Sequence, residues 1–398
     1  MYRRIYLDHA ATTPLRSEAR AAMEPFLDEY SVGNPSSLHM EGQRAKREID
    51  TARVIISEAL GCDFAEVTFT SGGTEADNAA ILGILLAAGP KRLHLIVSAI
   101  EHEAVLKTAS FAERLGFAVS VAMPDHRGII SPDEISSLIR EDTALVSVMH
   151  ANNEIGVIQP IREIAEVAHS GGALMHTDAV QSFGLLDFEV TSLNADLISI
   201  SAHKIYGPKG IGALYVRDGL PIEPFIHGGG QERERRAGTE NVAAIAGFGA
   251  AVKYMVLERN DEAARLSALR DMMFDEILRE TPEARINGDR DKRLPNNVNI
   301  SFLGMDAETM IVGLDMEGVA ASAGSACTSG SIEPSHVMRA MYSRDDEIGA
   351  TIRFTLGRGT TEEDVVEAVK RLKKVVSRQA ASRLAGSPPN PSRREGQE

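Results

Sequence analysis

Between residues 67 and 216, short apolar segments alternate with stretches of helical periodicity. The expected strands span residues 67–70, 93–99, 117–122, 145–149, 174–177, 197–200 and 211–216, and helices are expected at 75–87 and from 161 onward. Apolar runs this short are typical of strands that are buried on both faces. The pattern therefore predicts an α/β fold, with a mostly parallel sheet covered by helices on both faces.

A second, smaller domain is expected where this alternation ends. A long helical pattern from 241 to about 281, interpreted as one bent helix or two, leads to segments 297–302 and 351–355, which alternate like half-exposed strands, and then to a helix at 362–378. A chain of 398 residues also exceeds one core of ordinary size. We predict a large domain over 16–258, a small α+β domain from 1–15 and 259–380, and a disordered, proline-rich tail over 381–398.

The overall composition argues against several classes of function. A net charge of -15 does not suit nonspecific nucleic-acid binding, which needs a cationic surface. The two cysteines, Cys62 and Cys327, cannot build a disulfide framework or a zinc cage, and no HExxH motif is present. The first residues lack the apolar stretch of a secretory signal, and no apolar run is long enough to span a membrane. We expect a cytoplasmic protein without an intrinsic metal site.

Polar side chains follow five of the expected strands at the point where each one ends. They are Thr74, His102, Asn153, Asp178, Gln181, His203 and Lys204. In open α/β sheets, ligands bind outside the carboxyl ends of the strands. Buried polar groups are also costly unless they are paired. The pattern therefore predicts a single binding site at this edge of the sheet.

The segment Ser71-Gly72-Gly73-Thr74 lies between an expected strand and an expected helix. Two glycines at such a place let main-chain N–H groups approach an anion, and the helix N-terminus adds a partial positive charge. The pattern suits a phosphate group, although an ordinary helix cap with a glycine turn would have the same sequence. Neither a Walker loop nor a dinucleotide-binding glycine motif is present.

Asp178 and Lys204 together suit pyridoxal phosphate. A carboxylate beside the ring nitrogen of this cofactor keeps that nitrogen protonated, and a partly desolvated lysine can bond covalently to the carbonyl carbon of the cofactor. His102 would lie against the ring face, and Gln181 would bond the phenolic oxygen. Taken singly, Asp178 could be a helix cap, His102 a buried structural histidine and Lys204 a loop lysine. The joint pattern favours the cofactor, with the phosphate bound by Thr74, Ser201 and His203.

Cys327 lies in a loop of small residues without an apolar anchor, so we expect it to be exposed and mobile. A cysteine in that setting suits a nucleophile that acts as a thiolate, whereas Cys62 suits a structural role. Arg353, on an expected strand, offers a two-pronged donor for a substrate carboxylate. Its alternative interpretation is an ordinary arginine on the surface of a strand.

These motifs resemble the cysteine desulfurases of the NifS/IscS type, class V aminotransferase-like enzymes of the fold-type I pyridoxal-phosphate superfamily. The resemblance runs from about residue 6 to about residue 380. The cysteine loop and the stretch after it are more similar to the nitrogenase-associated NifS branch than to the housekeeping branch. The matching segments are LDHAATTP from Leu7, GNPSS from Gly33, SGGTEADN from Ser71, EH at Glu101, ANNEIG from Ala151, DAVQ from Asp178, SAHKIYGPKGIGALY from Ser201, HGGGQE from His227, RAGTEN from Arg236 and SAGSACTSGSIEPSHV from Ser322.

The resemblance implies a role for each residue of the site. Lys204 holds pyridoxal phosphate covalently, Asp178 pairs with the pyridine nitrogen, and His102 stacks on the ring. Gln181 and Asn153 bond the ring oxygen and its surroundings. The implied phosphate ligands are Gly73, Thr74, Ser201 and His203, with Thr239 contributed by the other subunit of a homodimer. The implied ligands of the substrate carboxylate are Arg353, Asn34 and Asn153.

The implied reaction converts L-cysteine to L-alanine, with Lys204, His102 and Cys327 as the catalytic residues. Lys204 moves the α-proton, and the thiolate of Cys327 takes the sulfur as a persulfide. A sulfur-acceptor protein, such as an iron–sulfur scaffold, would then receive the sulfur. Cys327 could briefly ligate an iron–sulfur cluster during that transfer.

Two alternatives remain open from the sequence. One is another class V enzyme, such as a selenocysteine lyase or an aminotransferase; Cys327 argues against the aminotransferase, which needs no such thiol. The other is a noncatalytic scaffold for sulfur-acceptor proteins, which would need neither Lys204 nor Asp178. One departure from the family pattern is Glu234, where relatives carry a glycine. A positive φ there would strain the chain and affect the loop that carries Thr239.

Overall fold

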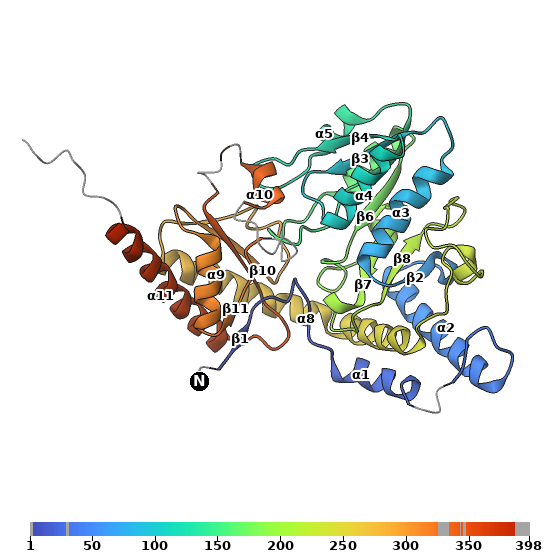
Figure 1. Cartoon of the computed structure of the whole chain (residues 1–398), viewed down its shortest axis with the longest axis horizontal. Helices are drawn as coiled ribbons and strands as arrows, with labels where there is room; N and C mark the ends of the chain where they lie inside the picture. The colour runs from blue at the N-terminus through green and yellow to red at the C-terminus, as the bar shows by residue number, and fades with distance from the viewer. Residues whose placement is uncertain (1–2, 29–31, 325–333, 343, 345–347, 387–398) are drawn as a thin grey trace, which may run out of the picture.

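The structure is a computed structural model that describes residues 3–28, 32–324, 334–342, 344 and 348–386, with side chains up to residue 381. A larger α/β part and a smaller part lie side by side, and the long helix α8 (Val242–Glu280) extends along both (Figure 1). The predicted α/β fold with a smaller α+β part is therefore confirmed.

Within the described residues, the larger part is built on a seven-stranded sheet in the order β2-β8-β7-β6-β5-β3-β4. Strands β3, β4, β5, β6 and β7 pair in parallel, and β8 runs antiparallel to both of its neighbours. The strands are β2 (Val67–Thr70), β3 (His94–Ser98), β4 (Ala118–Ala122), β5 (Thr143–Ser147), β6 (Leu174–Asp178), β7 (Leu197–Ser201) and β8 (Gly212–Val216). Strand β5 begins two residues before its predicted start, because Thr143 already pairs with His94 of β3.

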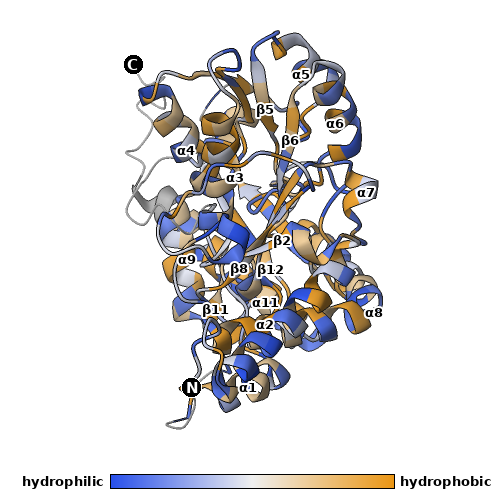
Figure 2. Cartoon of the chain, turned by 90° about the vertical axis from the view of Figure 1, so that its right-hand side faces the viewer, coloured by the Kyte–Doolittle hydropathy of each residue, from blue (hydrophilic) through white to orange (hydrophobic). Residues whose placement is uncertain are grey.

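Apolar side chains alternate between the two faces of this sheet. Leu95 of β3 and Leu197 of β7 belong to one buried cluster, whereas their neighbours Ile96 and Ile198 belong to another. This is the two-residue period of a strand, and it shows that both faces are covered. Apolar residues lie on β5 and β6 and on the nearby helices (Figure 2). The shorter helices of the larger part are α1 (Ser17–Met23), α2 (Met40–Leu60), α3 (Gly73–Ala87), α4 (Glu103–Arg114), α5 (Pro132–Leu138), α6 (Ile161–Ser170) and α7 (Val190–Leu193).

Helix α8 is one continuous helix of 39 residues, which settles the choice between one helix and two. Its first half, with Phe248 and Val252, packs into the core of the larger part. Its second half, with Met273 and Ile277, packs into a separate apolar cluster of the smaller part. The same helix therefore serves both cores, and a domain boundary near residue 258 stays a prediction.

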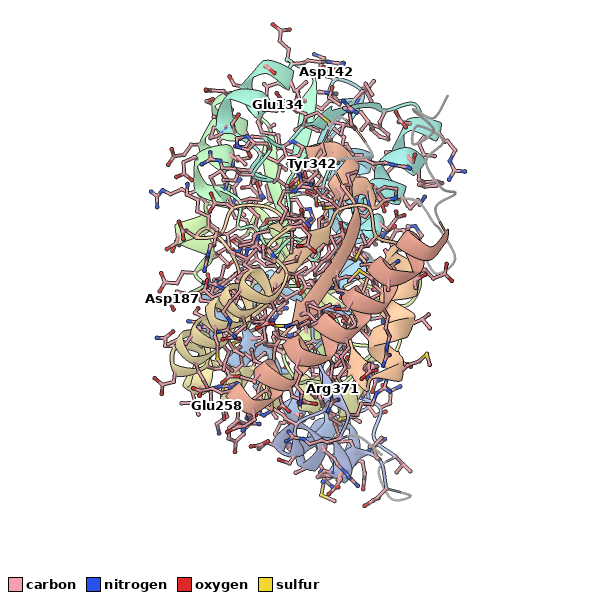
Figure 3. All side chains as sticks on the ribbon, turned by 90° about the vertical axis from the view of Figure 1, so that its left-hand side faces the viewer. Glu134, Asp142, Asp187, Glu258, Tyr342 and Arg371 are labelled. Atoms are coloured by element: carbon pink, nitrogen blue, oxygen red, sulfur yellow. The ribbon has the colours of Figure 1, made fainter. Side chains whose placement is uncertain are left out.

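The smaller part has a three-stranded antiparallel sheet in the order β12-β10-β9 and a two-stranded pair of β1 and β11. Helix α11 lies along it, and Arg371 of α11 (Figure 3) donates to the carbonyl oxygens of Arg3 and Glu317. The bond to Arg3 joins α11 to the start of the described chain. The elements are β1 (Ile5–Tyr6), β9 (Ala284–Ile286), β10 (Asn297–Phe302), β11 (Val319–Ala320), β12 (Ala350–Thr355), α9 (Ala307–Met316), α10 (His336–Met341) and α11 (Glu362–Gly386).

Two predictions for the smaller part are wrong. Strands β10 and β12 are buried along their whole length rather than half exposed. The polar positions that suggested exposure are buried and paired: Asn297 and Asn299 each donate to the Glu154 carbonyl oxygen at 3.0 Å. Helix α11 continues to Gly386, beyond its predicted end at residue 378. Residues 379–385 contain good helix formers and no glycine or proline, so nothing stops the helix earlier.

Across the described ranges, no helix has both the length and the apolar character that a membrane span requires. The described residues also contain no cluster of three or more histidine, cysteine, aspartate or glutamate side chains that could hold a metal ion.

Candidate active site

A cavity of about 300 Å³ lies at the carboxyl ends of the parallel strands, against the N-terminal segment and Arg353 of β12. Most residues that the sequence predicts for the site line this cavity. They are Gly73, Thr74, His102, Asn153, Asp178, Gln181, Ser201, His203, Lys204 and Arg353. The structure thus brings together residues from distant segments, while the role of each one stays a prediction.

The turn between β2 and α3 forms one end of the cavity and suits an anion. Gly72 precedes the helix with φ 153° and ψ -178°, a conformation that is essentially restricted to glycine. A Cβ atom on Gly73 would lie 2.7 Å from Cγ2 of Val180, so this position also needs glycine. The Ser201 hydroxyl, which faces the same cavity, is buried and has no hydrogen-bond partner among the described residues. A buried hydroxyl without a partner is costly, so it favours a bound acceptor here.

Asp178 is the last residue of β6 and is 5% exposed. One carboxylate oxygen accepts a hydrogen bond from the Val180 N–H at 2.8 Å, which closes a local turn. Turns rather than a helix follow, so Asp178 is not the helix cap that the sequence also allowed. Burial raises the pKa of Asp178, and the nearby His102 and Lys204 oppose that effect. A cation placed against this carboxylate would favour its ionised form.

Lys204 ends the short helix η3 (Ala202–Lys204), directly after β7. Its Nζ donates to the main-chain carbonyl oxygens of Ala10 at 2.6 Å and Ala11 at 2.7 Å. The next residue but one, Tyr206, has a left-handed φ of 64°, and its N–H donates to the Thr13 hydroxyl at 2.8 Å. The N-terminal segment therefore holds both the lysine amine and the backbone beyond it.

Two cavity histidines are oriented by hydrogen bonds. His102 caps α4, and its Nδ1 accepts from the Ala104 N–H at 3.1 Å, so the proton of the neutral ring lies on Nε2. His203 has its Nδ1 3.2 Å from the Thr12 hydroxyl. Burial, together with the charges of Lys204 and Lys209, lowers the pKa of His203 to about 4. His203 is therefore neutral at neutral pH and can donate or accept a hydrogen bond.

Arg353 is only 2% exposed, and its guanidinium is held at two points. One terminal nitrogen donates to the Asn153 carbonyl oxygen at 2.8 Å, and the other donates to Asp8 Oδ1 at 2.8 Å. The Nε atom is buried without a partner among the described residues. A buried guanidinium with a spare donor at the cavity wall suits a carboxylate ligand.

Several cavity residues were missed by the sequence reasoning. Asp77 could have been found, because it lies one helical turn after Thr74 in α3. Burial and the charge of Asp178 raise its pKa well above the ordinary value. His336 gives no such signal; it comes from α10, and its Nε2 lies 2.8 Å from the Glu101 carbonyl oxygen. The other missed residues are Ala10, Ala11, Glu103, Met149 and Val180.

Three predicted site residues are not among those that line the cavity. Asn34 is exposed, and its Oδ1 accepts from the Ser36 N–H at 2.9 Å. Thr239 is exposed beyond the short helix η4 (Glu232–Glu234). Cys327 lies outside the described residues. Cys62 is half-buried, and burial with the charges of Glu66 and Asp63 raises its pKa to about 12, so it remains a thiol.

Comparison with known proteins identifies the class that this fold and site define. A family model described as aminotransferase class-V matches residues 5–368, and the chain belongs to the class V aminotransferase family. Within that family it is similar to the cysteine desulfurase IscS of Dictyoglomus turgidum, at 47% identity over 378 residues, which are 95% of this chain and 96% of that protein.

Solved structures agree with this assignment. A NifS-like protein superposes with a TM-score of 0.88 at 34% identity, covering 94% of this chain and all of that one. SspA, solved in complex with cysteine, superposes with a TM-score of 0.79 at 37% identity over 88% of this chain and 98% of that one.

Proposed function

We propose that the protein is a pyridoxal-phosphate-dependent cysteine desulfurase, which converts L-cysteine to L-alanine and retains the sulfur as a persulfide on Cys327. The observation that carries the proposal is the placement of Asp178 and Lys204 on one cavity, with the anion-binding turn of residues 72–74 at its end. Full-length similarity to the Dictyoglomus turgidum cysteine desulfurase supports the choice of reaction.

The residues at the cavity fit this cofactor. Phosphate would be held by the Gly73–Thr74 turn and by the Ser201 hydroxyl, which is otherwise buried without a partner among the described residues. Asp178 would hold the ring nitrogen in its protonated form, and Lys204 would supply the covalent attachment. When bound, the cofactor withdraws electrons from the α-carbon of the amino acid and so weakens the bonds around it.

Arg353 would bind the carboxylate of an amino-acid substrate. Its guanidinium is fixed by Asp8 and by the Asn153 carbonyl oxygen, so it loses little freedom on binding a carboxylate. L-cysteine is the substrate we propose, because SspA, at 37% identity, has been solved with cysteine. Asn153 and Asn34 would assist only if they approach the same carboxylate, which stays a prediction.

The side chains divide the chemistry between them. The Lys204 amine takes the α-proton and is kept in place by the carbonyl oxygens of Ala10 and Ala11. The Cys327 thiolate attacks the substrate sulfur, so a sulfur–sulfur bond forms and the carbon–sulfur bond breaks. The carbon keeps the electron pair and takes up protons to give alanine, while the two sulfur atoms remain on the protein as a persulfide.

We further propose a homodimer in which Thr239 contributes to the partner's phosphate site. Its exposure in the single chain supports this arrangement. The persulfide would pass to a sulfur-acceptor protein such as an iron–sulfur scaffold, and a dedicated role in nitrogenase assembly is a narrower form of the same proposal. A reducing, cytoplasmic setting suits a reactive thiolate.

The test is a comparison of three forms of the purified protein supplied with pyridoxal phosphate. We expect the wild type to show the visible band of the lysine-bound cofactor and to release sulfide and alanine from L-cysteine in the presence of a reductant. Cys327→Ser should keep the band and lose sulfide release, whereas Lys204→Ala should lose both. Normal sulfide release by Cys327→Ser would contradict the proposal, and conversion of L-cysteine to its 2-oxo acid, without alanine or sulfide, would favour an aminotransferase.

A further inference from the structure

Three consecutive residues after the glycine-rich loop adopt a left-handed backbone conformation. Glu232, Arg233 and Glu234 have φ values of 46°, 56° and 66°, and none of them is glycine. Side chains disfavour this conformation, so such a turn persists only where its surroundings hold it. The strain that the sequence suggested for Glu234 is thus present at three positions.

A buried ion pair holds the start of this turn. Arg53 of α2 and Glu232 are 3% and 2% exposed at their side chains, and their atoms meet at 2.7 Å and 2.8 Å in a two-pronged pair. Glu232 also accepts a hydrogen bond from the Phe69 N–H of β2 at 3.0 Å. The Arg53 guanidinium lies over the Phe69 ring, 4.6 Å from its centre. Glu232 is therefore fixed to both α2 and β2.

A second ion pair holds the end of the same turn. Arg236 Nε donates to Glu75 Oε1 at 3.0 Å, and Glu75 Oε2 accepts from the Ser71 N–H at 2.8 Å. Burial raises the pKa of Glu75, but the hydrogen bonds from Arg236 and Ser71 outweigh burial and hold the pKa below its ordinary value. Glu75 is therefore ionised in the first turn of α3, directly after the residues that face the cavity.

We propose that residues 232–236 are a positioning element for the anion-binding turn at residues 71–74. Glu232 is hydrogen-bonded to β2 just before the turn, and Arg236 is paired with Glu75 of α3 just after it. One segment therefore fixes both sides of the turn. Arg236 also neutralises a carboxylate that would otherwise repel a phosphate at the helix N-terminus. The inference rests on the proposed function, because the anion it serves is the phosphate of the cofactor.

The test measures the affinity of the full-length protein, freed of cofactor, for pyridoxal phosphate and for pyridoxal, which lacks the phosphate. Arg236→Gln should lower the affinity for pyridoxal phosphate about 10-fold and the affinity for pyridoxal less than about 3-fold, since the lost charge-assisted contact supports only the anion site. Arg162→Gln is the matched control: it removes an arginine charge from an exposed ion pair with Glu166 on α6, outside this element, and should change neither affinity. Glu75→Gln combined with Arg236→Gln should recover part of the loss, because no unpaired carboxylate then remains.

Equal weakening of both ligands by Arg236→Gln, or no weakening, would overturn the inference. A wild type that does not prefer pyridoxal phosphate to pyridoxal would instead overturn the proposed cofactor, so the two failures are distinguishable. If Arg236→Gln fails to fold, the same comparison is made in a Glu234→Gly background, which relieves strain at φ 66° and should raise Tm by about 2 °C.

Discussion

The side-chain nitrogen of Lys204 donates to the main-chain carbonyl oxygen of Ala10 at 2.6 Å, across 194 residues of sequence. The segment that carries Ala10 is itself fixed by Thr13, whose hydroxyl donates to the His203 carbonyl oxygen at 3.0 Å. The same hydroxyl accepts from the Tyr206 N–H at 2.8 Å. The amine and the segment that receives it therefore form one hydrogen-bonded unit.

Breaking this unit should impair catalysis. Thr13→Val keeps the shape of the side chain but removes both bonds of the hydroxyl, at a cost of about 1–3 kcal/mol in folding free energy. We expect kcat to fall about 10-fold because the Lys204 amine is less well placed. Thr51→Val, which removes only an exposed bond to the Arg47 carbonyl oxygen, is the control. An equal effect of the two substitutions on kcat would contradict this role of Thr13.

Asp178→Asn should weaken cofactor binding and slow turnover. An amide cannot hold the ring nitrogen in its protonated form, so we expect about 10-fold weaker binding and at least about 100-fold lower kcat. Titration of the visible absorption band with pyridoxal phosphate measures the first effect. Asp187→Asn is the matched control, because Asp187 lies on the surface (Figure 3) with its side chain 87% exposed. Unchanged binding in Asp178→Asn would contradict the assigned contact.

Arg353→Gln should raise the KM for L-cysteine by about 10- to 100-fold, the effect of losing charge-assisted bonds to a carboxylate. The visible band of the bound cofactor should remain, because this side chain faces the substrate. Arg358→Gln serves as a control, since Arg358 is partly exposed and pairs with Glu258. An unchanged KM in Arg353→Gln would place the substrate carboxylate elsewhere.

Glu101 should make the protein less stable as the pH rises. Burial raises its pKa to about 8, so the folded state keeps a proton that the unfolded chain gives up above its ordinary pKa of 4.5. The contribution of Glu101 to folding stability is therefore fully present below pH 4.5 and is lost as the pH rises from 4.5 to about 8. Glu101→Gln should raise the free energy of unfolding at pH 8 by about 2–4 kcal/mol and leave it unchanged at pH 4. Denaturant unfolding at both pH values measures this, with the exposed Glu113→Gln as the control; equal effects at both pH values would contradict it.

The sequence predicts the larger part of the fold well, because its signals are local. Each strand of the parallel sheet is a short apolar run, and Asp178 and Lys204 follow such runs directly. The contacts that organise the cavity are not local. Carbonyl oxygens of Ala10 and Ala11 leave no mark in a side-chain pattern, and the pairing of Arg353 with Asp8 joins residues 345 positions apart.

The burial of β10 and β12 was missed for the same reason. Asn297 and Asn299 read as exposed in sequence, because polar residues in a strand usually face water. Their partner is the Glu154 carbonyl oxygen, which the fold supplies from the larger part of the chain. Buried polar groups of this kind become visible only when their hydrogen-bond partners are placed.

The most direct test of the proposed sulfur transfer is a single turnover of L-cysteine without reductant, followed by mass measurement of the protein. The chain has two cysteines, so Cys327→Ser and Cys62→Ser distinguish the possible carriers completely. We predict one molecule of alanine per active site and a mass increase of one sulfur atom in the wild type and in Cys62→Ser, with neither in Cys327→Ser. Alanine and the added sulfur in Cys327→Ser would contradict the proposed transfer.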